Sequence, residues 1–67
     1  MFKQYQVIKI IRDLNSSIKE GMQGVILETF NNDHYEVEFL DENGINFSFD
    51  NQFTFILAGK DLKSIEL

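Results

Sequence analysis

The chain contains no cysteine and no proline, and it has a single histidine. The absence of cysteine excludes disulfides and thiolate metal sites, and it is compatible with a reducing compartment. No stretch approaches the roughly 18 continuous apolar residues of a membrane span. The first residues, MFKQYQVIKIIRDL, are interrupted by lysine and glutamine and lack a small-residue cleavage site, unlike an export signal. We therefore expect a cytoplasmic protein that does not enter the membrane.

Groups for catalysis are equally scarce. His34 is the only histidine and no serine lies in a recognisable nucleophile turn, so acyl transfer and thiol chemistry lack their parts. His34, Glu36 and Glu38 could bind a divalent metal from one face, but this pattern is more often a solvated strand face. Gly21 and Gly24 lack the richer glycine pattern of a phosphate-binding loop. We expect no enzymatic activity, no cofactor and no metal.

The length of 67 residues predicts one domain, residues 1–67. A chain of this size buries only about 60% of the surface that its unfolded form exposes, so its core is marginal. Large aromatic side chains compensate by burying much area each. The chain has nine of them: Phe2, Tyr5, Phe30, Tyr35, Phe39, Phe47, Phe49, Phe53 and Phe55.

Short apolar and alternating segments predict β-strands. In HYEVEFL, apolar Tyr35, Val37 and Phe39 alternate with more polar residues, which is typical of a strand with one dry face. Tyr5 to Ile11 carries apolar residues on both faces, as in a strand that is covered on both sides. The apolar residues of GVILETF do not alternate cleanly, which a β-bulge or a barrel corner would explain. The predicted strands are residues 5–11, 24–30, 34–40, 45–49, 53–57 and 64–67.

The connections between these strands are also predicted. Residues 12–22 are polar with isolated Leu14, Ile18 and Met22, which indicates a long ordered loop pinned by its apolar side chains. Gly21 and Gly24 suggest positive dihedral angles or a close chain approach. Tight turns are predicted at residues 31–33 and at Asn43-Gly44, and a 3₁₀ turn at residues 60–62. Five to six short strands with a long loop after the first indicate an all-β fold, a small SH3-like barrel.

A set of motifs resembles a family of short bacterial proteins catalogued as a domain of unknown function. The matching features are Asp13 in the long loop, the GxxG of Gly21 to Gly24, VILE at 25–28, YEVEF at 35–39, Gly44, and Asp61-Leu62 followed by Ile65. Those proteins are similar to SH3-like barrels and, more loosely, to KOW modules of translation and transcription factors. Their genes often lie near toxins and mobile elements, so the resemblance implies a neutralising role.

Charge is segregated along the chain. Eight acidic residues and no basic ones lie between Glu20 and Gly59, and all six basic residues lie toward the two ends. In an SH3-like barrel the last strand pairs with the first, so we expect a basic patch beside a larger acidic hairpin surface. Such an acidic surface repels phosphate backbones and attracts basic proteins, although acidic surfaces also serve solubility alone.

These patterns predict a non-catalytic protein-binding module. Its most specific form is an immunity or antitoxin-like inhibitor that docks on a basic partner such as a toxin domain, with an exposed phenylalanine as anchor. The expected contact residues are Glu28, Glu36, Glu38, Asp41 and Glu42. One alternative is a KOW-like module that binds RNA or the ribosome through Lys9, Arg12, Lys60 and Lys63. A third is a structural accessory domain of a larger protein.

Overall fold

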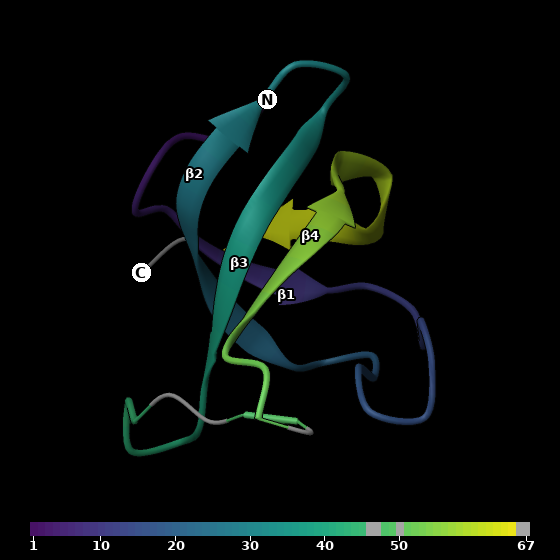
Figure 1. The fold of residues 1–67 in the computed structure, drawn as a ribbon, viewed down its shortest axis with the longest axis vertical. Coiled ribbons are helices and arrows are strands. Elements are labelled where there is room, and N and C mark those ends of the chain that lie inside the picture. Colours follow the sequence, from purple (N-terminus) through teal and green to yellow (C-terminus); the bar gives the residue numbers. More distant parts are fainter. Residues whose placement is uncertain (46–47, 50, 66–67) are drawn as a thin grey trace.

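The computed structural model describes residues 1–45, 48–49 and 51–65. It shows one antiparallel sheet of five strands in the order β4-β3-β2-β1-β5 (Figure 1). The elements are β1 (Val7–Ile10), β2 (Gln23–Phe30), β3 (His34–Leu40), β4 (Thr54–Ala58), the 3₁₀ turn η1 (Gly59–Asp61) and β5 (Leu62–Ser64). The all-β prediction is confirmed, and β5 pairs with β1 as expected. The sheet is bent but not closed into a barrel, so β4 and β5 are its edges.

The core lies on the inner face of the bent sheet. Tyr35, Val37 and Phe39 of β3 are at most 2% exposed, which confirms the predicted inner set. The inner face also contributes Ile8 and Ile10 from β1, Ile26 from β2, Leu57 from β4 and Leu62 from β5. Neighbouring Val7 and Lys9 are only half-buried, so β1 is covered chiefly on its inner side, contrary to the expectation of a strand covered on both faces.

The irregular β2 contains the bulge that its sequence suggests. The register shifts between Ile26, which pairs with Val37, and Glu28, which pairs with Glu36. Gly24 is buried, and a Cβ there would lie 2.8 Å from the carbonyl oxygen of Glu38. The close chain approach expected at a glycine is therefore present at Gly24. Gly21 shows the other expected property, with a φ of 93°.

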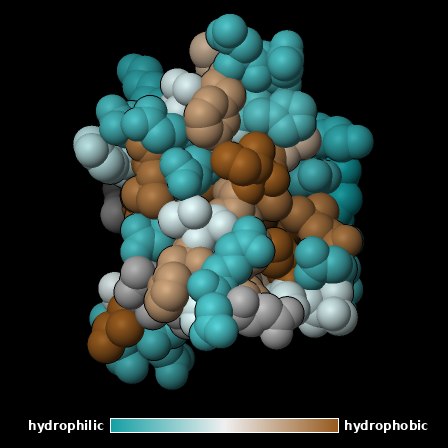
Figure 2. All heavy atoms as spheres, viewed as in Figure 1, coloured by the Kyte–Doolittle hydropathy of each residue, from teal (hydrophilic) through white to brown (hydrophobic). Residues whose placement is uncertain are grey.

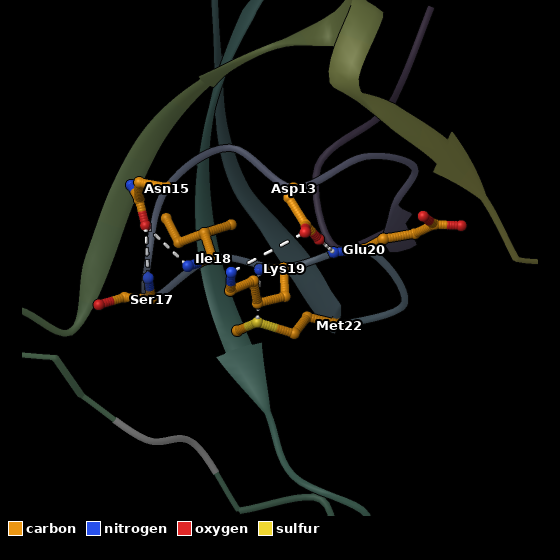
Figure 3. Close-up of polar contacts among 7 residues, drawn as sticks. All are labelled: Asp13, Asn15, Ser17, Ile18, Lys19, Glu20 and Met22. Carbon is orange, nitrogen blue, oxygen red and sulfur yellow. Dashed lines mark hydrogen bonds and ion pairs between the residues drawn. The ribbon is translucent and has the colours of Figure 1, made fainter.

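The long loop between β1 and β2 is held by its own side chains (Figure 3). Asn15 Oδ1 accepts hydrogen bonds from the backbone N–H groups of Ser17 and Ile18, at 2.7 and 2.8 Å. Asp13 Oδ1 accepts one from the N–H of Glu20 at 2.9 Å. Ile18 is 3% exposed and belongs to the core, with Leu14 and Met22 packed against it. The three apolar residues pin the loop as predicted.

Several predicted boundaries are corrected by the structure. Tyr5 has a φ of 68°, so it lies in a turn and not in the first strand. Residues 46–47, within the predicted strand 45–49, lie outside the described residues; Ile45 and Ser48 are not in a strand, and Phe49 pairs only with Gln52 in an isolated bridge. The closing strand is Leu62–Ser64 instead of 64–67, and residues 66–67 lie outside the described part.

The predicted turns are confirmed in part. Asn32 and Asp33 both adopt positive φ values, 71° and 57°, in the tight turn between β2 and β3. Gly44 has a φ of 79°, but Asn43 is not among the residues with positive φ. The central residues of this turn are Glu42 and Asn43, and neither has a positive φ, so the turn after β3 is not of a primed type. Asp41 closes it, because its carbonyl oxygen accepts the N–H of Gly44 at 3.0 Å.

Candidate binding surface

The outer face of the β2–β3 hairpin carries a compact group of carboxylates. On β3, Glu36 and Glu38 alternate with the buried inner set. Glu28 lies directly opposite Glu36 because the bulge in β2 shifts the register. Opposite residues in an antiparallel pair have Cβ atoms about 4.5–5.5 Å apart. The structure therefore brings together three of the five predicted contact residues on one face.

This carboxylate pairing is unfavourable in the isolated domain. Like charges directly opposite one another on a sheet destabilise it, and no basic residue lies between Glu20 and Gly59 to offset them. Two ion pairs are found among the residues that the structure describes, Arg12–Asp61 at 3.0 Å and Lys19–Asp13 at 3.8 Å. Neither includes Glu28 or Glu36. Glu28 is exposed and Glu36 is half-buried, and no ion pair within the described part of the chain offsets either carboxylate.

The other two predicted contact residues lie in the turn after β3. Asp41 is exposed, but its Oδ1 atom accepts backbone N–H groups from Asn43 at 2.8 Å and Ile45 at 3.0 Å. Asp41 therefore has a structural role in the turn in addition to its charge. Glu42 is exposed in the same turn and extends the acidic surface beyond the end of β3.

Exposed apolar side chains lie on or next to β2 and β4. Ile56 of β4 lies opposite Glu36 and is 57% exposed. Phe30 at the end of β2 is 47% exposed, and Phe53, just before β4, is 56% exposed. Figure 2 shows apolar surface in the middle of this view, in the region of β4, with hydrophilic side chains around it. An apolar centre with charged surroundings is the arrangement common at protein-binding sites.

The basic residues do not form one uniform patch. Lys9 and Lys63 lie directly opposite each other on β1 and β5. Arg12, however, is bound to Asp61 Oδ1, and Lys60 is exposed in η1. The expected gathering of basic residues where the chain ends meet is present at Lys9 and Lys63, while Arg12 is in an ion pair with Asp61.

Other classes of site find no support in the described ranges 1–45, 48–49 and 51–65. These residues contain no cluster of three or more potential metal ligands. His34 Nδ1 lies 2.7 Å from the carbonyl oxygen of Asn32 and is thereby engaged by the adjacent turn. No helix in this part of the chain is long and apolar enough to cross a membrane.

A small open-sheet domain with an acidic outer face is thus the class that fold and surface define. The chain belongs to a family described as a domain of unknown function (DUF4926), whose model matches residues 4–47. The match covers β1, β2 and β3, including the acidic hairpin, and it confirms the family that the motifs indicated. No curated protein and no solved structure matches the chain.

Reasoning from sequence missed one element of this surface. The sequence predicts a strand at FTFIL, which contains Ile56, but does not indicate which of its residues face outward. The exposure of Ile56 follows from its position on the edge strand β4, beside Glu36. Ile56 lies beside Glu36 because β4 pairs with β3. No local pattern in the sequence indicates which strands are neighbours.

Proposed function

We propose that this domain is a non-catalytic binding module that docks its acidic hairpin face on a basic protein. The contact surface comprises Glu28, Glu36 and Glu38, extended by Asp41 and Glu42. Its specific role is that of an immunity or antitoxin-like inhibitor, in line with the neutralising role implied by the resemblance. The observation that carries the proposal is the opposition of Glu28 and Glu36 on the outer face.

The physical argument rests on what a cationic partner would relieve. A lysine or arginine placed between two opposed carboxylates converts a repulsive pair into an attractive network. The gain on binding is therefore larger than for two separate surface ion pairs, each of which is worth only about 0–1 kcal/mol. Complementary fields also accelerate encounter and orient the partner. The exposed Ile56 and Phe30 provide adjacent apolar area for a stable contact.

The test is affinity capture from native cells with three forms of the chain at physiological salt. We expect the wild type to retain a basic protein, and Glu36→Lys with Glu38→Lys to lower its recovery by about tenfold or more, since like charges then face each other. The matched control, Lys9→Glu with Lys63→Glu, changes as many charges on the opposite part of the sheet and should retain the partner. Circular dichroism checks that each form is folded.

Two outcomes contradict the proposal. Undiminished capture by the Glu36→Lys, Glu38→Lys form would remove the acidic face from the contact. Recovery of RNA or ribosomal material that is lost only in the Lys9→Glu, Lys63→Glu form would favour the KOW-like alternative, whose affinity must fall steeply with salt.

A further inference from the structure

The free edge of β4 differs from the protected edges of most natural sheets. Edge strands usually carry lysine, proline, an inward-pointing charge or a cover. The sequence of β4, TFILA, has none of these residues, and Ile56 at its centre is 57% exposed. An unprotected edge presents a row of backbone groups that can pair with another extended chain.

The direction of these backbone groups follows from the ladder with β3. In an antiparallel pair, hydrogen-bonded and non-hydrogen-bonded residue pairs alternate. The N–H of Gly59 donates to the carbonyl oxygen of Asp33 at 2.8 Å, so these two residues form a hydrogen-bonded pair. By alternation, Leu57 and Phe55 of β4 also form hydrogen-bonded pairs with β3. Thr54, Ile56 and Ala58 fall between them. Their N–H and C=O groups therefore point away from β3.

A contact within the chain agrees with this assignment. The side-chain amide of Gln52 donates to the carbonyl oxygen of Thr54 at 2.9 Å, which is accessible only from the free side of the strand. Among the described residues, no loop or turn forms a backbone hydrogen bond with Ile56 or Ala58. The edge is thus partly capped at its start and open at its centre.

A groove runs along this edge. It has a volume of about 380 Å³ and lies between β4 and the β1–β2 loop. One wall is polar, with Asn15, Ser16 and Ser17 in the loop that Figure 3 shows braced by its own hydrogen bonds. Phe49, Phe55 and Leu57 contribute apolar lining. Phe55 and Leu57 line the groove, so alternate side chains of a strand added beside β4 would project toward it.

The outer side of the same edge selects the charge of that strand. A residue added opposite Ile56 would lie about 4.8 Å from β4 and twice as far from β3. A lysine or arginine at that place can lay its apolar stem over Ile56 and bring its charged end to Glu36, which is opposite Ile56 on β3. An acidic residue there would instead meet like charge.

We infer that the β4 edge binds an extended segment of the basic partner as a sixth strand. The segment carries lysine or arginine on the side that faces Ile56 and Glu36, and small residues on the side that faces the groove. The backbone of Ile56 and Ala58 supplies the hydrogen bonds. This inference rests on the proposed function, because it names how the basic partner engages the acidic face.

The test uses the full chain and a nine-residue capped peptide of alternating lysine and valine, with a glutamate–valine peptide for comparison. We expect the lysine peptide to slow amide hydrogen exchange of Ile56 and Ala58 by about tenfold or more, as new backbone hydrogen bonds form. The glutamate peptide should give no protection. Peptide affinity is measured by titration of amide chemical shifts.

Edge variants test the backbone contact directly. Ile56→Pro removes a donor that β3 does not use, and proline is tolerated on edge strands; it should weaken peptide binding by about tenfold. Ile56→Lys leaves the backbone unchanged but places a like charge where the peptide's lysine would lie, so it should also weaken binding and tests the position of that lysine. The matched control is Ser64→Pro on the β5 edge. The hydrogen bond from the N–H of Ile65 to the carbonyl oxygen of Val7 directs the Ser64 N–H away from β1.

The outcomes separate this inference from the proposed function. If the lysine peptide binds and Glu36→Lys abolishes binding while the Ile56 amide stays unprotected, edge pairing is refuted and acidic docking stands. Equal protection by both peptides would refute the basic occupant of the edge and leave the proposed function to the capture experiment. Protection of Ile56 in concentrated protein alone would assign the edge to a second copy. Absence of any peptide binding would overturn the inference.

Discussion

At the scale of single residues, Tyr35 connects the N-terminus to the β2–β3 turn. Its ring is 2% exposed and packs edge-on against Phe2, with ring centroids 5.3 Å apart. Its hydroxyl accepts the N–H of Phe2 at 3.3 Å and donates to Asp33 Oδ1 at 2.9 Å. The N–H of Phe2 lowers the pKa of Tyr35, but burial, the hydrogen bond to Asp33 and the charge of Asp33 together raise this pKa above 10.0.

This network predicts a loss of stability in alkali. Because the pKa is higher in the folded than in the unfolded chain, the neutral hydroxyl stabilises the fold below about pH 10, and that contribution is lost as the pH rises through the folded-state pKa. Tyr35→Phe should therefore show a smaller drop in unfolding temperature between pH 9 and 11 than the wild type. Tyr5→Phe, at a site that is 69% exposed, is the control. Identical drops in the wild type and Tyr35→Phe would contradict the assignment.

At the scale of elements, the β2–β3 hairpin combines a well-packed inner face with a repulsive outer one. Ile26, Val37 and Phe39 are fully buried on the inner side, whereas Glu28 and Glu36 oppose each other outside. Burial of apolar area outweighs a surface repulsion that is worth only a fraction of a kcal/mol. The hairpin can therefore retain the opposed charge pair without losing its packing.

Neutralising one member of this pair should stabilise the free domain. We expect Glu36→Gln to raise the free energy of unfolding by about 0.2–1 kcal/mol at low salt, because it removes a directly opposed like charge. Urea unfolding followed by circular dichroism measures the change. Glu28→Gln should give a similar gain, and the double variant should gain less than the sum, because both remove the same repulsion. Strict additivity would show that the two carboxylates do not interact.

At the scale of the whole molecule, dimensions and charge together set the salt response. The domain measures 26 × 25 × 19 Å and has a formal net charge of −5. The Debye length is about 30 Å at 0.01 M salt and about 10 Å at 0.1 M. At low salt every carboxylate therefore lies within the field of all the others, and at physiological salt only near neighbours interact.

The domain should accordingly become more stable as sodium chloride is raised from 10 to 200 mM. A relief of about 0.5–1 kcal/mol corresponds to an increase of about 2–8 °C in unfolding temperature for a domain of this size. Thermal unfolding at neutral pH measures the effect, and the Glu28→Gln, Glu36→Gln form should show a weaker salt dependence. A fall in unfolding temperature over this range would mean that attractive ion pairs outweigh the repulsion.

Sequence and structure contribute differently to these conclusions. The alternation in HYEVEFL was sufficient to identify the inner residues Tyr35, Val37 and Phe39, because the two-residue period of a strand is local. Turn chemistry located the bend at Asn32 and Asp33, and isolated apolar residues such as Ile18 showed that the long loop is packed. The predicted first strand begins too early, at Tyr5, because β-propensity carries no information about the positive φ of that residue.

The amino-acid order alone thus determined an all-β domain, the inner face of β3 and the segregation of acidic from basic residues. Tertiary structure decided what those charges face. By simple alternation Glu28 would share the inner side of Ile26; the bulge between them turns Glu28 outward, opposite Glu36. The free edge at β4 was likewise decided by strand order. Both depend on pairing between distant segments, and no local pattern in the chain encodes which segment lies beside which.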